Sequence, residues 1–228
     1  NHMSPTGRPK GESAPKREAR RVVQSPDGPP PGRISPEARS AEGRPVTTRL
    51  ESLEAIEAAL WRELQAATRD KQHPWRTPVL ATTDGQIGDA STVIVREADQ
   101  AQHALLVYTD ARAGKVAQIA EHPQGTLVMW SPGLGWQLRL RVQLQTVTDG
   151  LELSSRWAQL KLSPAANDYL SPQAPGAPLD QALASRSERA HFALIEASVL
   201  SIDWLELHAQ GHRRARFDKR DTPRWLQP

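Results

Sequence analysis

The chain has 228 residues, a formal net charge of +3 and no cysteine, so disulfide bonds, thiolate metal sites and a cysteine nucleophile are excluded. None of its apolar runs approaches the roughly 20 residues that a membrane-spanning helix needs, and its first residues contain no hydrophobic signal segment. These features lead us to expect a soluble, cytoplasmic protein that does not bind a membrane.

Residues 1–46 differ from the rest of the chain in charge and composition. They carry nine Lys or Arg against five Asp or Glu, and nine of the nineteen prolines. Because such a segment buries too little apolar surface to offset its ordering entropy, we predict a disordered basic tail. Its first residues, Asn1-His2-Met3, resemble the remnant of an expression tag. The folded domain is then 47–228, where 20 basic residues stand against 21 acidic ones, so we do not expect it to bind nucleic acid.

A helix is predicted at the start of this domain. Thr48 and Glu51 have the spacing of a capping box, in which each side chain satisfies a free backbone N–H group. Apolar residues then recur every three or four positions up to about Arg69, as in an amphipathic helix. They are Leu50, Leu53, Ile56, Leu60 and Leu64. We expect this helix to cover one side of a sheet.

After His73-Pro74 the pattern changes to that of short strands. Segments rich in β-branched and aliphatic residues predict strands at 77–83, 90–96, 104–109 and 125–130. A short helix is expected at 114–121, because His122-Pro123 would end it.

The clearest strand is 136–145, where apolar and polar residues alternate over ten positions. Residues 150–162 have a helical pattern, and 163–190 form a proline-rich connection with one helical turn. Strands are then expected at 192–198, 202–208 and 213–217. Six or seven short strands with few helices predict a mainly β fold with flanking helices, arranged as a closed or nearly closed barrel.

The residues alone leave the chemistry open. No phosphate loop, zinc-protease motif or serine-hydrolase elbow is present. The seven histidines lack the spacing of metal ligands, so no metal is expected. Cations such as Arg96 and Lys115 fall at strand ends or beside a helix N-terminus, which suits a phosphate monoester. The alternative is that they are solvated charges at the rim of a barrel.

Seven short segments follow one another in a distinctive order over about residues 75–228. They are Ser91-Thr-Val-Ile-Val-Arg96, Tyr108-Thr109-Asp110, Gly114-Lys115-Val-Ala-Gln118-Ile119, Trp136-Gln137-Leu138-Arg139, Ile202-Asp203-Trp204, His212-Arg-Arg-Ala-Arg216-Phe217 and Trp225-Leu226-Gln227-Pro228. In order and spacing they resemble the cofactor-binding segments of the pyridoxamine 5'-phosphate oxidase superfamily. The most similar subgroup consists of oxidase-like FMN-binding proteins that end in a His-Arg-Arg-Ala-Arg-Phe segment.

The resemblance implies a six-stranded split β-barrel that forms a homodimer, with two FMN molecules at the subunit interface. It implies that the backbone of residues 92–95 lies along the flavin, that Lys115 holds its phosphate, and that Gln137, Trp204 and Arg216 approach from neighbouring strands or from the partner subunit. The full cofactor-binding set that it implies is Ser91, Thr92, Val93, Ile94, Val95, Arg96, Tyr108, Thr109, Lys115, Gln137, Trp204 and Arg216.

The sequence departs from the family pattern at several positions. Ser91 and Gly114 stand where the family usually has arginines that grip the phosphate, although Arg112 lies close enough in sequence to replace one of them. The stretch from His212 to Arg216 differs from the Arg-Leu-His-Asp-Arg motif that contacts substrate in true pyridoxamine phosphate oxidases. We therefore do not expect pyridoxamine phosphate to be the substrate.

The sequence thus predicts an FMN-dependent oxidoreductase that removes a hydride from a C–H group beside an amine or alcohol. Arg96 and Arg214 are the residues expected to face the substrate and to take part in catalysis. Three alternatives remain open at this point, and the first is nucleic-acid binding through the basic tail of residues 1–46. The other two concern the folded domain. One is a flavin-binding protein without turnover, and the other is a split barrel that binds haem or another anionic ligand in place of FMN.

Overall fold

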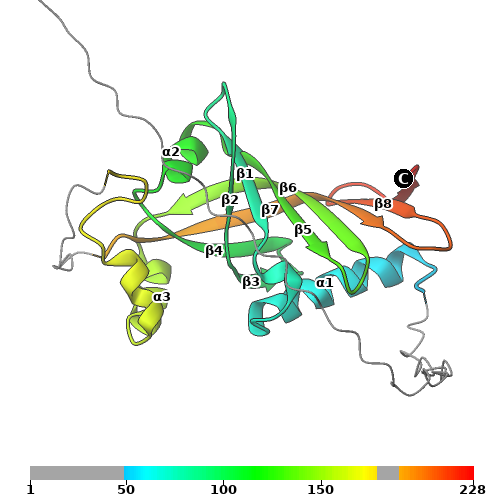
Figure 1. Cartoon of the computed structure of the whole chain (residues 1–228), viewed down its shortest axis with the longest axis horizontal. Coiled ribbons are helices and arrows are strands. Elements are labelled where there is room, and N and C mark those ends of the chain that lie inside the picture. Colours follow the sequence, from blue (N-terminus) through cyan, green and yellow to red (C-terminus); the bar gives the residue numbers. More distant parts are fainter. Residues whose placement is uncertain (1–48, 179–189) are drawn as a thin grey trace, which may run out of the picture. The chain divides into compact units, whose positions relative to one another are not determined.

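The computed structural model describes residues 49–178 and 190–228 (Figure 1). The predicted disorder of residues 1–46 therefore lies outside the described residues. Helices are α1 (Leu53–Arg69), α2 (Gly114–Glu121) and α3 (Leu151–Leu160), with 3-10 helices η1 (Pro74–Arg76) and η2 (Pro164–Tyr169). No helix in the described ranges is long and apolar enough to cross a membrane.

The strands are β1 (Val79–Thr83), β2 (Gly88–Thr92), β3 (Val95–Asp99), β4 (Ala104–Asp110), β5 (Gln124–Ser131), β6 (Trp136–Val147), β7 (Phe192–Glu206), β8 (Arg213–Asp218) and β9 (Arg224–Leu226). The mainly β fold with flanking helices is confirmed. The described part of the chain has nine strands where the resemblance implied six.

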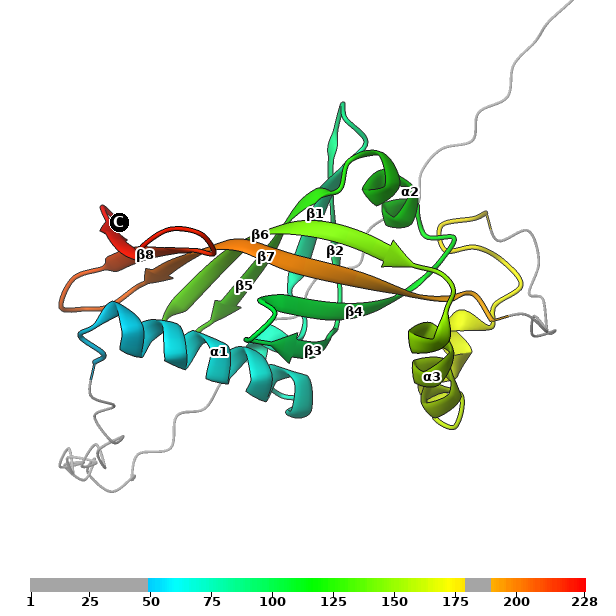
Figure 2. The same ribbon diagram turned by 180° about the vertical axis from the view of Figure 1, so that it is seen from behind.

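All pairings between neighbouring strands are antiparallel, in the order β2-β1-β5-β6-β7-β4-β3. β2 and β3 stand at the two ends of this order, yet Val93 and Ile94 alone join them in sequence. Because two residues span only a few ångströms, the two ends of the sheet must approach one another. This link is what curls the sheet into a barrel (Figure 2).

Residues 90–96 were predicted to form one strand, and this prediction is wrong. The first part belongs to β2, which pairs with β1, whereas the second belongs to β3, which pairs with β4. The N–H of Val93 donates to the carbonyl of Pro78 at 3.0 Å and ends the first ladder. The apolar pattern continues through the break because Val93 and Val95 both point into the core.

Two strands were predicted at 192–198 and 202–208, and they form one strand, β7. Opposite β6, Arg141 pairs with Ser201 and Val142 pairs with Val199. Leu200 is therefore the extra residue of a β-bulge, which reverses the alternation of side chains at that point. The bulge explains why the sequence pattern appeared to break.

α1 ends at Arg69, as predicted, but it begins later than the proposed capping box. The hydroxyl of Ser52 accepts a hydrogen bond from the N–H of Ala55 at 3.1 Å, so Ser52 is the N-cap. Thr48 lies outside the described residues. The capping box is wrong because Leu50 and Glu51 precede the helix.

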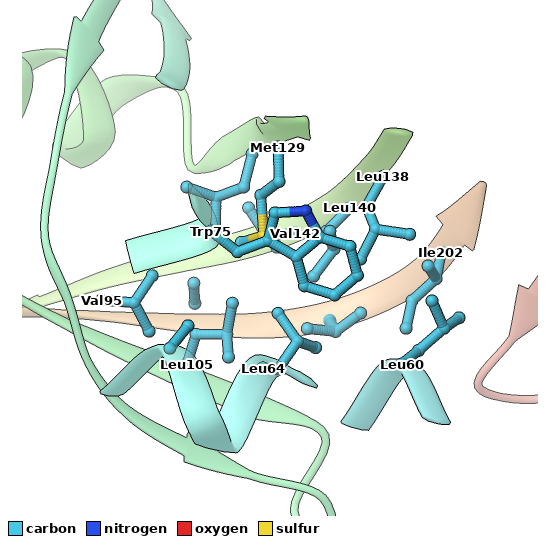
Figure 3. Close-up of a cluster of buried hydrophobic side chains, with 14 of the residues drawn as sticks. Leu60, Leu64, Trp75, Val95, Leu105, Met129, Leu138, Leu140, Val142 and Ile202 are labelled. Atoms are coloured by element: carbon cyan, nitrogen blue, oxygen red, sulfur yellow. The ribbon is translucent and has the colours of Figure 1, made fainter. Parts of the chain in front are cut away.

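The barrel has one main core, which α1 closes from one side. Trp75 lies at its centre, with Leu64 of α1 and Met129, Leu140 and Val95 of the sheet around it (Figure 3). A second cluster lies on the outer face of β4 and β7, where α3 and η2 cover them. It contains Leu106, Tyr169, Phe192 and Leu194, with Tyr108 and Trp157 packed against it.

Truncating Leu64 to alanine should lower the free energy of unfolding by about 2–5 kcal/mol, because this side chain is 0% exposed and its removal leaves a cavity between α1 and the sheet. Leu162→Ala is the matched control, since that leucine is 85% exposed and should cost less than about 0.5 kcal/mol. Urea unfolding measures both values. Equal effects would contradict the packing of α1 against the sheet.

Candidate functional site

The link between β2 and β3 presents backbone to the outside of the barrel. Ile94 lies outside both strand ladders, and its side chain is 37% exposed. On either side, Val93 and Val95 are buried and anchor the link in the core. Thr92 is exposed, and Ser91 is half-buried opposite Leu80. The link is thus a fixed and accessible backbone edge.

Arg96 follows this edge at a β-bulge. Val95 pairs with Val107 and Glu97 pairs with Leu106, which leaves Arg96 as the additional residue. Its guanidinium carbon lies 5.2 Å from the centre of the Tyr108 ring. Among the described residues, its buried Nε has no hydrogen-bond partner. A buried donor without an acceptor costs free energy, so Arg96 is poised to donate to a bound molecule.

Sequence reasoning missed Tyr169, which joins Arg96 and Tyr108. It comes from η2, is 7% exposed and packs edge-on against Phe192 at 5.2 Å. Burial raises the pKa of both tyrosines, so both phenols stay neutral near physiological pH. The segment that carries Tyr169 has no motif, so only the packing of η2 on the sheet reveals it.

Lys115 lies in the first turn of α2, close to β2. One turn further along, the side-chain amide of Gln118 accepts from Thr82 at 2.6 Å and donates to Asp89 at 3.3 Å. Ser91 is two residues along β2 from Asp89 and thus on the same side of that strand. Lys115 and Ser91 consequently share the surface between α2 and β2, and within the described residues Lys115 has no ion-pair partner.

No side chain caps the N-terminus of α2. Free N–H groups in the first turn of a helix, together with a lysine, are suited to bind a phosphate. Thr109, the last residue but one of β4, is buried at 7% exposure. Ser91, the 92–95 link, Arg96, Tyr108, Thr109 and Lys115 are the predicted residues on β2, β3, β4 and α2, and we call them the link group.

Arg112 does not replace a missing phosphate cation. Its Nε and Nη2 donate to the carboxylate of Asp110 at 3.0 and 2.7 Å, and its backbone N–H donates to the same carboxylate at 2.8 Å. Although burial alone would raise the pKa of Asp110, these bonds with Arg112 hold it below its usual value. The guanidinium is thus committed to Asp110, and the suggestion that it substitutes for a family arginine is not supported.

Three other predicted residues share the outer face of β6 and β8. Gln137 pairs with Leu205, which in turn pairs with Arg214. Arg214 donates to Asp203 at 3.0 and 2.6 Å, and Arg216 donates to Asp218 at 2.9 and 3.1 Å. We call Gln137, Arg214 and Arg216 the β8 group.

Burial would raise the pKa of Asp203, but hydrogen bonds from Arg214 and Arg139 lower it below its usual value. Asp203 is therefore a fixed negative charge that holds the side chain of Arg214 in place. Arg214 was predicted to face a substrate, and its other donors remain free to do so because the side chain is 29% exposed.

Trp204 does not join the β8 group. Its side chain is 0% exposed and packs edge-on against Trp136 at 5.5 Å, while the guanidinium of Arg213 covers its ring at 5.6 Å. The bulge at Leu200 sets which residues of β7 point outward, and it sends Trp204 into the core. The expectation that Trp204 touches a cofactor is not supported by this placement.

The two groups lie far apart in one chain. Tyr108 of the link group pairs with Leu194, and Gln137 of the β8 group pairs with Leu205, both on β7. Eleven residues of extended strand separate these positions, which corresponds to roughly 35 Å. In Figures 1 and 2, α2 and β8 accordingly lie toward opposite ends of the sheet.

Comparison with known proteins agrees with this architecture. Residues 58–148 match the family model for the FMN-binding domain of pyridoxamine 5'-phosphate oxidase. Over these residues the chain is similar to the pyridoxamine 5'-phosphate oxidase family. The match ends before β7 and β8, so membership of the subgroup with the His-Arg-Arg-Ala-Arg-Phe segment stays a prediction. No curated protein sequence matches the chain.

Two solved structures share the fold of this chain over most of its length. One is a pyridoxamine 5'-phosphate oxidase-related, FMN-binding protein from Nostoc punctiforme, with a TM-score of 0.61 and 19% identity over 79% of this chain and 100% of that one. The other is PhzG from Burkholderia lata in complex with tetrahydrophenazine-1-carboxylic acid, with a TM-score of 0.60 and 15% identity over 78% of this chain and 94% of that one. The split-barrel fold is thereby confirmed.

The link group fits FMN. A flavin needs a flat surface with backbone polar groups and a cationic place for its phosphate, and the exposed link and the uncapped α2 with Lys115 provide these. Because Ser91 and Gly114 stand where the family usually has arginines, Lys115 is the cation that would bind the phosphate at α2. Within the described residues no cluster of His, Asp and Glu is arranged to hold a metal ion.

Asp110→Asn should lower the free energy of unfolding by about 2 kcal/mol near neutral pH, because it removes the charge that two guanidinium hydrogen bonds require. The folded-state pKa of Asp110 lies below its usual 3.8, so its contribution is complete above that pH and is lost as the pH falls further. The difference between variant and wild type should therefore shrink in acid, as urea unfolding at several pH values would show.

Asp221→Asn is the control for this variant, because the Asp221 side chain is 68% exposed and pairs with Arg224 at the surface. It should change stability by less than about 0.5 kcal/mol. A deficit of Asp110→Asn that stays constant down to acid pH would contradict the assigned ion pair.

Proposed function

We propose that this protein is an FMN-dependent oxidoreductase that acts on a small molecule carrying an amine or alcohol. The observation that carries this proposal is the exposed edge at Ile94 next to the uncapped N-terminus of α2 with Lys115. When bound, FMN would accept a hydride from the substrate and pass the electrons to an acceptor such as oxygen. The residues of the chain supply binding and orientation.

In this proposal each residue of the link group has a defined task. The backbone of Thr92 to Val95 lies along the flavin ring, with Tyr108 and Thr109 beside it. Lys115, the first-turn N–H groups of α2 and the hydroxyl of Ser91 hold the phosphate. Arg96 uses its unpartnered Nε to orient the substrate, and its stacking on Tyr108 fixes the guanidinium plane.

We further propose that a second copy of the chain completes the site. Tyr108 of the link group and Gln137 of the β8 group lie roughly 35 Å apart along β7, so one chain cannot place both on the same flavin. A symmetric dimer pairs the link group of one subunit with the β8 group of the other, twice. Arg214, held by Asp203, would then face the substrate from the partner subunit.

Pyridoxamine phosphate is not the proposed substrate. The substrate motif of true pyridoxamine phosphate oxidases is absent, and Arg214, which lies in the corresponding stretch, is bound to Asp203. A different small molecule fits this altered surface better.

Lys115→Gln should weaken FMN binding about tenfold or more, because the variant loses a charge-assisted hydrogen bond to phosphate. Affinity is measured from the visible absorbance and fluorescence of the flavin during titration. Riboflavin, which has no phosphate, should bind the wild type and the variant equally. Lys71→Gln is the control, since Lys71 is exposed and has no partner among the described residues.

The same spectra test the cofactor itself. Purified protein that stays colourless with added FMN, or that shows haem absorbance, would contradict the proposed flavin. If Lys115→Gln weakens the binding of riboflavin and of FMN equally, Lys115 does not bind the phosphate, and the proposed phosphate position at α2 is contradicted. Bound FMN without oxygen consumption across amines and alcohols would leave a flavin-binding protein and contradict the oxidase activity with oxygen as acceptor.

Mixing two defective variants tests the shared site. Lys115→Gln damages the link group and Arg216→Gln damages the β8 group, so each homodimer has two damaged sites. Random mixed dimers have one intact site out of two, and about one quarter of all sites should recover high FMN affinity. Flavin titration after mixing and re-equilibration measures the recovered fraction.

A mixture of Lys115→Gln with Ile94→Asp is the matched control. Both changes damage the link group, so every mixed dimer keeps two damaged sites and no recovery should follow. Ile94 is exposed, and an aspartate there should not disturb the core. Recovery in this control, or none in the first mixture, would overturn the shared site.

A further inference from the structure

A cavity of about 360 Å³ lies on the outer face of the sheet, across β5, β6, β7 and β8. Four arginines and one carboxylate line it: Arg139, Arg141, Arg214, Arg216 and Asp203. The formal charge of this lining is +3, because all four guanidinium groups are protonated at any physiological pH. Arg139 ends one of the segments that carry the family resemblance, whereas none of those segments contains Arg141.

The arginines are fixed to different degrees. Asp203 accepts hydrogen bonds from Arg139 at 2.7 Å and from Arg214 at 2.6 Å, so one negative charge is shared by two guanidinium groups. Arg216 is bound to Asp218, which also accepts an ion pair from Arg224 at 3.1 Å. Asp203 and Asp218 each pair with two arginines, so neither carboxylate fully neutralises the arginines around the cavity.

Arg141 is different because, among the described residues, its side chain has no ion pair or hydrogen bond. It lies on β6 directly between Thr126 of β5 and Ser201 of β7 in the sheet register. Both neighbours also line the cavity, and the Ser201 hydroxyl accepts a hydrogen bond from Arg216 at 3.4 Å. A guanidinium and two hydroxyls therefore converge on one space, with further cations around it, and this combination binds oxyanions.

The cavity also lies on the face that carries the β8 group. Gln137, Arg139 and Arg141 alternate along β6, so their side chains point to the same side of the sheet. If the proposed dimer holds, this face meets the flavin of the other subunit. An anion bound at Arg141 would then belong to the molecule that reacts at that flavin.

We propose that this cavity binds an oxyanionic group of the substrate, a carboxylate or a phosphate, with Arg141 as the main contact and Arg139 and Arg216 as supporting cations. This inference rests on the proposed function and names its substrate class: an amine or alcohol that also carries an acidic group. The hydroxyls of Thr126 and Ser201 donate hydrogen bonds to the same group.

Isothermal titration calorimetry of the full chain at low ionic strength tests the cavity directly, because salt screens such contacts. The probes are inorganic phosphate and benzoate, which need no flavin for detection. The wild type should bind at least one of them, and Arg141→Gln should weaken that binding about tenfold or more, because a charge-assisted contact is lost. The tighter probe identifies phosphate or carboxylate as the substrate group.

Arg62→Gln is the matched control, because Arg62 is an exposed arginine of α1 that has no partner among the described residues. It should leave both probes unaffected. Equal binding in Arg141→Gln and the wild type, or no binding of either probe, would overturn the proposal. Arg141→Gln that sediments as a monomer but keeps the anion affinity of the wild type would also overturn the proposal. That result would mean that Arg141 contacts acidic side chains of a second copy of the chain and not an anion.

Flavin titration of Arg141→Gln separates this proposal from the proposed function. FMN affinity should stay as in the wild type, because Lys115 holds the phosphate elsewhere. Loss of FMN would place its phosphate in this cavity and contradict the substrate site. If the protein binds the anion at Arg141 but does not bind FMN, the anion site is supported and the proposed flavin function is contradicted.

Discussion

The antiparallel pairing of β7 is the constraint on which the rest of the structure depends. One edge of this 15-residue strand bonds to β6 over nearly its whole length, and the other edge bonds first to β4 and then to β8. The bulge at Leu200 separates these two halves and keeps Ile202 and Trp204 directed into the core. Because an extended strand cannot fold back on itself, the surfaces at its two ends stay far apart. A site that needs both surfaces needs two chains.

Buried and half-buried carboxylates decide which cations are available for ligands. Asp110 holds Arg112, Asp203 holds Arg214 and Arg139, and Glu206 holds Arg49 and Arg213. In each case burial raises the cost of the negative charge, and the paired guanidinium groups offset that cost and lower the pKa of the carboxyl. At the two candidate surfaces, Lys115 and Arg141 have no such partners among the described residues, so a bound anion can reach them without breaking an ion pair.

The sequence was sufficient for the β-rich fold and the limits of α2, because alternation and turn residues are local signals. It was insufficient where tertiary pairing decides. The apolar run from Ser91 to Arg96 does not indicate that the chain changes its pairing partner at Ile94. The pattern around Leu200 suggested a break between two strands, whereas the structure has a β-bulge inside one strand. Tyr169 and Arg141 carry no motif, and only the packing of η2 and the register of β5, β6 and β7 reveal their surroundings.

The departures from the family pattern have a physical consequence for recognition. Ser91 and Gly114 remove positive charge near α2, and Arg112 is unavailable there because Asp110 binds it. Positive charge is instead concentrated on the outer face of β6 and β8, where Arg139, Arg141, Arg214 and Arg216 gather. A molecule held only by its anionic group near α2 would lose affinity, whereas one with an acidic group reaching the β6–β8 face would gain it. Specificity for an acidic substrate can therefore arise without the substrate motif of the pyridoxamine phosphate oxidases, from residues on strands that the dimer would bring to the flavin.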